Sequence, residues 1–378
     1  MRSVIDNANL IVIKIGSVLV RGESLDQANH PWMDTLAQDI KKLKDQGKKI
    51  VIVSSGGVAL GRKALNIPAD ISPNSIPLAK KQAASAVGQY HLFNGYFNAF
   101  KKQGITAAQV LLTMSETENR RMNLNARETL HTLLESGIVP IINENDTVST
   151  EEIRFGDNDR LSVRVAQMIL ADTVIILSTT DGLYTDNPDI NPQATHIQLI
   201  ENLTDEHTQM AGDAIAGLST GGMKSKIEAA QAATKSGINL IITNGKDNHT
   251  LSNLYDDANK KSTLFVAKEC DKNARKTWLS AHMNPKGNIT IDDGALTALQ
   301  SGKSLLPVGV KQISGDFKRG DVIKITDQGG AKIGMGISAY DAGEATRIIG
   351  VRSSDVIDVL GYAGRTEIIH RNDMVIDA

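Results

Sequence analysis

Polar side chains that could bind a small molecule are concentrated in residues 140–160. Asn and Asp accept the unpaired backbone N–H groups at a helix start, but capping needs only one such residue. A merely polar loop is the alternative interpretation. Functional groups gather on loops held by a rigid scaffold, so we predict a binding site here. Six Asn and Asp residues lie between an apolar run, residues 137–142, and a helical pattern: Asn143, Asn145, Asp146, Asp157, Asn158 and Asp159.

Lysines occur at two further places where phosphate could bind. Lys14 lies near the end of an apolar strand, where open α/β sheets bind ligands; a lysine of an edge strand that reaches solvent is the alternative. A second group of residues opens a predicted helix, where bare N–H groups and the helix dipole favour an anion. Solvated surface charge is the alternative for its two lysines. The group consists of Thr220, Gly221, Gly222, Met223, Lys224, Ser225 and Lys226.

Strands and helices alternate along the first two thirds of the chain, which predicts βαβ units in a mainly parallel sheet with helices on both faces. A turn of small residues, Ser55, Gly56 and Gly57, follows the second strand and would let a ligand approach backbone N–H groups. The predicted strands are residues 10–17, 49–54, 109–112, 137–142, 173–178 and 239–243. The predicted helices are residues 32–46, 78–103, 120–135, 159–171 and 227–236.

From about residue 278 helical periodicity gives way to short β segments separated by glycine turns. We expect strands at residues 288–291, 310–313, 322–326, 331–337 and 367–370, with one short helix at residues 292–301. This pattern is typical of a small β-rich barrel or sandwich. We therefore predict two domains, residues 1–270 and residues 271–378.

Composition excludes several classes of protein. The 378 residues are 41% hydrophobic and 22% charged, and the net charge of −2 gives no general attraction to nucleic acid or anionic membrane. The single cysteine, Cys270, rules out a disulfide within the chain, and the eight histidines show no metal-ligand spacing. No run of about 18 apolar residues and no signal segment occur, so we expect a cytoplasmic protein.

Taken together, these motifs resemble the glutamate 5-kinase family of the amino acid kinase superfamily, and the tail resembles the PUA domain that many bacterial members carry. The resemblance spans nearly the whole chain. Its motifs in the first domain are residues 14–16, 54–57, 124–127, 140–146, 156–159, 181–184 and 217–226; those of the tail are residues 289–294, 302–307 and 317–320.

The resemblance implies a three-layer sandwich of helices around a mainly parallel sheet, followed by the small β-rich domain. It implies ATP and Mg²⁺, with the metal carried by ATP rather than by a protein site, and phosphorylation of the γ-carboxylate of L-glutamate, the first step of proline synthesis. Members are typically oligomeric, so we expect a homodimer or homotetramer, and L-proline inhibits them. No membrane partner is implied.

Site residues carry over by position. Ser55, Gly56, Asp146 and Asn158 match glutamate-binding residues, and Lys14 and Lys226 match phosphate-binding lysines. Nucleotide contacts are implied for residues 220–226 and for Ser178 and Thr179. The chain departs from the family at two places: the family usually has Thr-Asp at positions 178 and 179, and the loop after Lys14 is one residue short. Asp181 is a candidate replacement for the missing carboxylate.

A carboxylate acceptor, with an ordinary pKa of about 4.3, is ionised at neutral pH and needs no general base. Catalysis would rest on positioning and charge neutralisation. We expect Lys14 and Lys226 to neutralise the transferring phosphoryl group and Asp159 to hold both lysines. Backbone N–H groups would assist, from Gly16, Gly56, Gly57, Gly221 and Gly222.

Three other interpretations remain open. Another amino acid kinase would take N-acetylglutamate, aspartate, carbamate or a nucleoside monophosphate as acceptor. An RNA-binding protein is suggested by PUA domains in general, but residues 283–378 hold 11 Lys and Arg against 12 Asp and Glu, a net charge of −1. RNA affinity comes mostly from phosphate neutralisation, so this balance disfavours tight binding. An inactive regulatory subunit would be consistent with Thr179.

Overall fold

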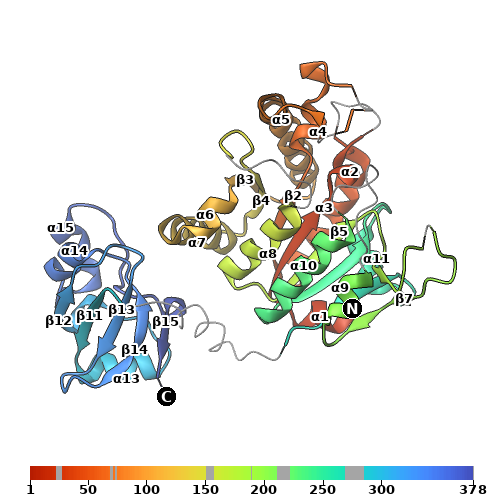
Figure 1. Cartoon of the computed structure of the whole chain (residues 1–378). Coiled ribbons are helices and arrows are strands. Elements are labelled where there is room, and N and C mark those ends of the chain that lie inside the picture. The colour runs from red at the N-terminus through yellow and green to blue at the C-terminus, as the bar shows by residue number, and fades with distance from the viewer. Residues whose placement is uncertain are drawn as a thin grey trace. The chain divides into compact units, whose positions relative to one another are not determined.

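The computed structural model describes residues 1–22, 28–68, 71–72, 75–149, 157–188, 190–210, 222–268 and 285–377. The chain divides into two compact units, Met1–Glu269 and Cys270–Ala378 (Figure 1). The predicted domain boundary after residue 270 lies outside the described residues. Each unit has its own apolar core, so each is described by itself.

The first unit is built on an eight-stranded sheet with the order β3-β4-β2-β1-β5-β9-β10-β8. The first six strands in this order, β3 through β9, are parallel to one another. Strand β10 pairs antiparallel with β9. Because β1 lies between β2 and β5, the interpretation of Lys14 as an edge-strand lysine is wrong. The strands are β1 (Leu10–Ile15), β2 (Lys49–Ser54), β3 (Ala107–Leu112), β4 (Val139–Glu144), β5 (Thr173–Ser178), β8 (Leu199–Ile200), β9 (Asn239–Asn244) and β10 (Ser262–Phe265).

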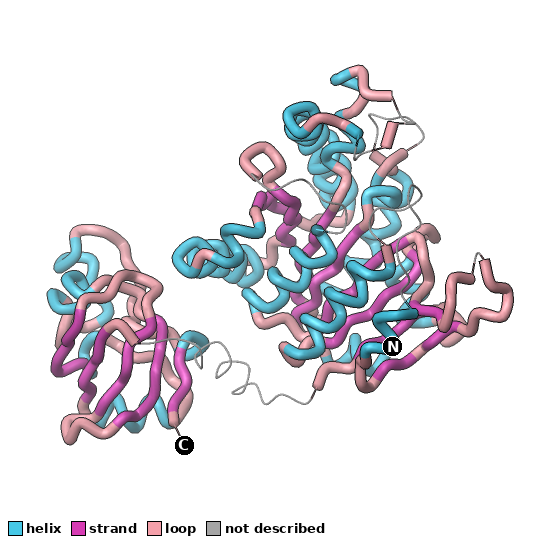
Figure 2. The backbone as a smooth tube through the Cα atoms, viewed as in Figure 1, coloured by secondary structure: helices cyan, strands magenta, loops and turns pink. Residues whose placement is uncertain are grey.

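Helices cover both faces of this sheet, which confirms the predicted three-layer α/β architecture (Figure 2). Alternation along β1 sends Ile11, Ile13 and Ile15 to one core and Leu10 and Val12 to the other. The first core is covered by α1 (Arg2–Asn7), α3 (His30–Asp45), α5 (Leu78–Lys102) and α11 (Thr250–Asp256). The second is covered by α7 (Arg120–Glu135), α8 (Asp157–Ile169) and α10 (Met223–Lys235).

Short elements complete the first unit. They are α2 (Ser17–Val20), α4 (Gly57–Gly61), η1 (Lys63–Leu65), α6 (Met114–Glu118), α9 (Asp205–Met210) and a small hairpin of β6 (Leu183–Tyr184) and β7 (His196–Ile197). Helix α4 contacts α5 so closely that a Cβ on Gly61 would lie 1.8 Å from the Ala84 carbonyl oxygen. A Cβ on Gly88 would lie equally close, at 1.8 Å, to the Gly57 carbonyl oxygen. Glycines at this crossing therefore allow the turn after β2 to rest directly on α5.

The second unit is a five-stranded sheet with the order β12-β11-β13-β14-β15. Its strands are β11 (Gly287–Ile291), β12 (Val310–Gly315), β13 (Val322–Thr326), β14 (Lys332–Ile337) and β15 (Met374–Ile376). The predicted strand at residues 367–370 is wrong: Ile369 makes only an isolated bridge to Leu305, and β15 forms the sheet edge instead.

The prediction of a single helix in the second unit is also wrong. Besides α13 (Asp293–Gln300), the structure has α14 (Ala342–Arg347), capped by Asp341, and α15 (Val356–Leu360). Both are too short to produce a clear apolar period in the sequence. Short 3-10 turns occupy Pro307–Gly309, Ser353–Asp355 and Arg371–Asp373. Among the described residues of both units, no helix is both long enough and apolar enough to cross a membrane.

Candidate functional site

The predicted site residues meet at the carboxyl edge of the parallel strands. Lys14 is the penultimate residue of β1, and it lies beside Val53 of β2 and Ile176 of β5. It has the same parity as Val12, so its side chain belongs to the face covered by α8 and α10. Those two helices lie side by side in Figure 1. Ligands of open α/β sheets bind at this edge, where the strand order reverses around β1.

Asp159, in the first turn of α8, lies between two buried lysines. Its Oδ1 is 2.6 Å from Lys14 Nζ, and its Oδ2 is 3.2 Å from Lys226 Nζ. Ser225 donates its hydroxyl to the same Oδ2 at 2.9 Å. Asp159 is fully buried, while Lys14 and Lys226 are only 7% and 4% exposed. One carboxylate thus holds two ammonium groups from different elements, β1 and α10, and leaves the trio with a net positive charge.

Charge and burial compete in this trio. Burial raises the pKa of Asp159, but Lys14 and then Lys226 favour the ionised carboxylate more strongly and lower that pKa from 3.8 to about 2. Burial lowers the pKa of Lys226, with Asp159 acting in the opposite direction and Lys14 reinforcing the decrease. The geometry therefore concentrates positive charge in a space shielded from water, where it acts most strongly on an anion.

The depressed pKa of Asp159 predicts an acid-sensitive contribution to stability. A carboxyl group that titrates at 3.8 when unfolded and at about 2 when folded stabilises the fold above pH 3.8. By linkage, that contribution of about 2 kcal/mol is lost as the pH falls from about 4 to about 2. We expect the free energy of unfolding, measured by urea titration at successive pH values, to fall more steeply in this window for wild type than for Asp159→Asn. Parallel curves for the two proteins would contradict the assignment.

The neighbouring residue Asn158 points into a second cluster, formed by the ends of β2 and β4. Asn158 Nδ2 donates to Ser55 Oγ at 2.9 Å and to Asn143 Oδ1 at 3.3 Å. Its Oδ1 is buried and has no hydrogen-bond partner within the part of the chain that the structure describes. A buried acceptor without a partner costs about 1–3 kcal/mol, so a bound donor is the natural explanation.

Asp146 lies in the segment after β4 and is 7% exposed. It accepts a hydrogen bond of 2.5 Å from Ser85 Oγ of α5. Gly57 brings the turn after β2 to the same place, because a Cβ there would lie 2.8 Å from Ser85 Oγ and 3.4 Å from Asn143 Nδ2. The preceding Gly56 has a φ of 125°, a conformation that favours glycine. The structure thus gathers the predicted residues Ser55, Gly56, Asp146 and Asn158 around one polar cluster.

The residues predicted to contact the nucleotide are only partly described. Met223, Lys224 and Ser225 open α10, and Lys224 is exposed whereas Lys226 is buried, so the two lysines have different environments. Thr220 and Gly221 lie outside the described residues. Gly222 is the residue before α10 and adopts an extended conformation.

Ser178 is the last residue of β5, and Thr179 begins a loop that is hydrogen-bonded to the end of β9. The Ser178 carbonyl accepts from Gly245 N at 2.8 Å, and the Thr179 carbonyl accepts from Asn244 Nδ2 at 3.3 Å. The carboxylate of Asp181, the candidate replacement for an acidic residue at position 179, accepts from the Tyr184 hydroxyl at 3.1 Å. Backbone contacts therefore define this segment, and the role of its side chains stays a prediction.

One expected phosphate ligand has another partner. The Gly16 N–H donates to the Leu177 carbonyl at 3.2 Å, which extends the pairing of β1 with β5. The expectation that this N–H assists phosphate binding is therefore wrong. Helix α2 starts at the next residue, so the short loop is accommodated by turning directly into a helix.

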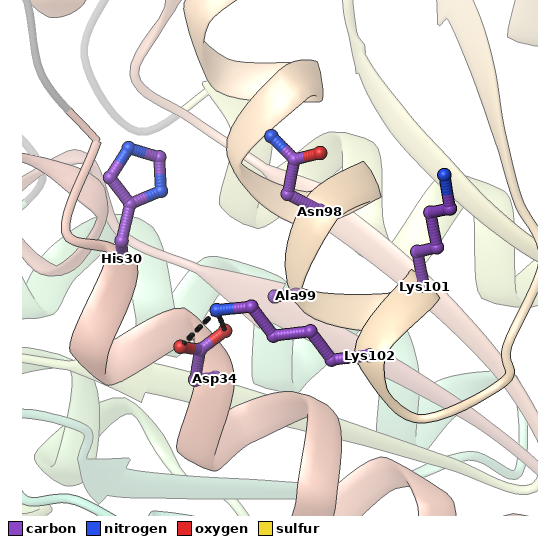
Figure 3. Close-up of a pocket in the computed structure, with 6 residues that line it drawn as sticks. All are labelled: His30, Asp34, Asn98, Ala99, Lys101 and Lys102. Carbon is purple, nitrogen blue, oxygen red and sulfur yellow. Dashed lines mark hydrogen bonds and ion pairs between the residues drawn. The ribbon is translucent and has the colours of Figure 1, made fainter.

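A surface pocket between α3 and α5 does not include the predicted site residues (Figure 3). Lys102 Nζ is 2.7 Å from Asp34 there, so its charge is compensated. Among the described residues no group of three or more His, Cys, Asp or Glu side chains could hold a metal ion. The candidate site is the carboxyl edge of the sheet rather than this pocket.

Sequence reasoning did not identify Ser85, Gln89 and Tyr96, the buried polar residues on the inner face of α5. They occupy helical positions i, i+4 and i+11 and would have been found only by asking which polar residues share the buried face. Asn143 was included in the polar stretch, but its contact with Asn158 required the structure.

Family models match both units. The model of the amino acid kinase family matches residues 9–244, and the model of the PUA domain matches residues 287–360. Solved structures of UMP kinases from Ureaplasma parvum and Bacillus anthracis are 17% and 13% identical, with TM-scores of 0.44 and 0.49. The U. parvum enzyme matches 68% of this chain over 98% of its own length, and the B. anthracis enzyme matches 69% of this chain over 97% of its own length. At this level of similarity they say nothing about the acceptor.

Curated relatives match along the whole chain. Glutamate 5-kinase of Sinorhizobium fredii is 47% identical over 97% of this chain and 92% of the relative. Glutamate 5-kinase 1 of Rhizobium meliloti is 45% identical over 100% of this chain and 94% of the relative. Glutamate 5-kinase of Ruegeria sp. is 46% identical over 98% and 99% of the two chains. The similarity therefore includes both units.

Proposed function

Because this chain belongs to the glutamate 5-kinase family of amino acid kinases, we propose that it transfers the γ-phosphoryl group of ATP to the γ-carboxylate of L-glutamate. The products are L-glutamyl 5-phosphate and ADP, and the reaction opens proline biosynthesis. Two clusters at one sheet edge support this proposal. The lysine cluster is Lys14 and Lys226 held by Asp159, and the amide-lined cluster is Asn158 with Ser55 and Asn143.

The observation that carries the proposal is the adjacency of Asn158 and Asp159. Asn158 reaches Ser55 and Asn143, while Asp159 contacts Lys14 and Lys226. Two consecutive residues in the first turn of α8 therefore contact two neighbouring clusters, one suited to an amino acid and the other to phosphate. In-line transfer needs the two reactants side by side in fixed orientation.

The acceptor carboxylate is ionised at neutral pH, so the chemical difficulty is bringing an anion to a triphosphate. Lys14 and Lys226 neutralise the equatorial oxygens of the transferring group, where a preorganised charge stabilises the transition state. Asp159 keeps both ammonium groups in place before the reactants bind. The resulting net positive charge fits the triphosphate; Mg²⁺, when bound with ATP, supplies further charge neutralisation.

The amide-lined cluster provides complementary groups for the amino acid. The buried Asn158 Oδ1 and the Asp146 carboxylate would accept from the α-ammonium group. Ser55 Oγ accepts from Asn158, so its own O–H can donate to the α-carboxylate. The missing side chain of Gly56 leaves room for Val20, so any contribution of Gly56 to binding would come from its backbone N–H. A wrong amino acid leaves buried polar groups unpaired, which is the basis of strong discrimination.

The nucleotide would lie between the start of α10 and the end of β5. Residues 220–226 supply N–H groups, and the dipole of α10 favours phosphate at that terminus. Ser178 and Thr179 would contact the nucleoside. We place the reaction in the cytoplasm and expect a homodimer or homotetramer that L-proline inhibits.

The deciding experiment is ADP release from Mg-ATP with L-glutamate, compared with N-acetylglutamate, aspartate, carbamate and UMP. Hydroxylamine traps the acyl phosphate and identifies the product. We expect turnover with glutamate and its suppression by proline. Turnover only with another acceptor would overturn the substrate, and inactivity with all five would favour a regulatory subunit.

The role proposed for Asp146 predicts a specific kinetic defect. Asp146→Asn removes a charge-assisted bond to the α-ammonium group, so we expect the glutamate KM to rise about tenfold or more. The ATP KM and kcat should stay within about twofold, because Asp146 is hydrogen-bonded to Ser85 of α5, whereas Asp159 holds Lys14 and Lys226. Asp34→Asn, which removes a carboxylate on the α3 surface, is the control. An unchanged glutamate KM in Asp146→Asn would move the acceptor site elsewhere.

A further inference from the structure

Helix α5 carries a line of buried polar side chains on its inner face. Ser85 is 1% exposed, Gln89 is 9% exposed and Tyr96 is fully buried. Their positions in the helix place them on one side, next to small residues such as Gly88 that let α4 approach closely. Buried polar groups are costly unless each has a partner, so their contacts indicate what they do.

Each of these side chains contacts a segment that forms the acceptor site. Ser85 Oγ donates to Asp146 Oδ2 at 2.5 Å, and Gln89 Nε2 lies 3.4 Å from the Glu144 carbonyl oxygen. Tyr96 shares a hydrogen bond of 2.9 Å with Ser54 Oγ, which in turn donates to the Ser55 carbonyl at 3.0 Å. One helix face therefore supports both walls of the acceptor site, the end of β2 and the segment after β4.

We propose that Ser85 and Tyr96 are positioning residues that set the affinity for the amino acid acceptor, Ser85 through Asp146 and Tyr96 through Ser54 and Ser55. This inference rests on the proposed function. Ser85 is the stronger of the two because its bond to an ionised carboxylate is charge-assisted and fixes the side-chain torsion of Asp146. Its hydroxyl also lies next to Gly57, so Ser85 adjoins both the turn after β2 and the segment after β4.

The contacts of α5 distinguish this role from one in phosphate transfer. Ser85 and Tyr96 form hydrogen bonds with Asp146 and Ser54, whereas Lys14 and Lys226 are held by Asp159. Loss of either hydroxyl should therefore weaken acceptor binding equally in the ground state and the transition state. Such a loss raises KM and leaves kcat unchanged.

The test measures steady-state kinetics of the full chain with Ser85→Ala and Tyr96→Phe. We expect the glutamate KM to rise about tenfold in Ser85→Ala and about threefold in Tyr96→Phe, with kcat and the ATP KM within about twofold of wild type. The control is Thr234→Val, which removes a buried hydroxyl that donates to the Ala230 and Gln231 carbonyls of α10. Circular dichroism and urea unfolding establish that each variant is folded.

A double variant tests the route of the effect. If Ser85 acts through Asp146, adding Ser85→Ala to Asp146→Ala should leave kcat/KM for glutamate unchanged, whereas Tyr96→Phe should keep its effect in that background. Additive losses for Ser85 would overturn its assignment. An unchanged glutamate KM in both folded single variants, or equal changes in both KM values and kcat, would overturn the proposal. Wild type that is inactive with glutamate would instead overturn the proposed function, and this inference with it.

Discussion

Lys226→Ala should lower kcat by about two orders of magnitude or more. Removal of a single preorganised donor to developing charge has an effect of this size in other enzymes. Lys226 is buried in the first turn of α10, and its ammonium group is 3.2 Å from Asp159. A water molecule that filled the space left by the side chain would supply no positive charge. Initial rates at saturating ATP and glutamate give kcat directly.

The matched control is Lys235→Ala, which removes an exposed lysine from the last turn of the same helix. We expect its kcat to equal that of wild type. Near-wild-type kcat in Lys226→Ala would remove this lysine from the mechanism. A loss confined to the ATP KM would assign it to ground-state binding of the nucleotide instead.

Asp159→Asn should reduce the free energy of unfolding by about 2 kcal/mol or more, because it leaves two buried ammonium groups without their carboxylate. The amide keeps only one of the two accepting oxygens and supplies no negative charge. Urea unfolding at neutral pH measures the loss. Activity should fall as well, since both lysines lose the group that fixes their position.

A second substitution separates charge from shape. Asp159→Asn combined with Lys226→Met removes one of the two uncompensated charges while keeping an unbranched side chain. We expect this double variant to regain part of the stability lost in Asp159→Asn, while remaining inactive. Equal stability of the single and double variants would show that repulsion between the lysines is not the cause.

The core of the first unit was predictable because its elements are long and strongly patterned. Residues 49–54, 120–135 and 173–178 have the same bounds in the prediction and in the structure. Apolar strands that alternate with helices of ten or more residues leave few topologies. In the second unit α14 and α15 were missed, since helices of six and five residues show no clear period.

The candidate site was predictable in its residue types and less so in its contacts. Residues such as Lys14, Asp159 and Lys226 stood out individually, but only the fold shows that one carboxylate contacts both lysines. The Gly16 N–H was misjudged because strand pairing continues beyond the last apolar residue of β1. Ser85 and Tyr96 were missed because the sequence of α5 does not reveal which of its faces is buried.

The alternation along β1 limits how the length of this part of the chain can change. Lys14 faces the layer of α8 and α10 because it stands at an even-numbered position of β1. Ile11, Ile13 and Ile15 stand at odd-numbered positions and face the opposite layer. A one-residue insertion or deletion inside the strand would exchange the two faces and place the ammonium group in the apolar core under α3. After Gly16, by contrast, the chain turns at once into α2 and can lose a residue without altering that parity. Insertions and deletions should therefore accumulate after this strand among homologous sequences and be absent within it.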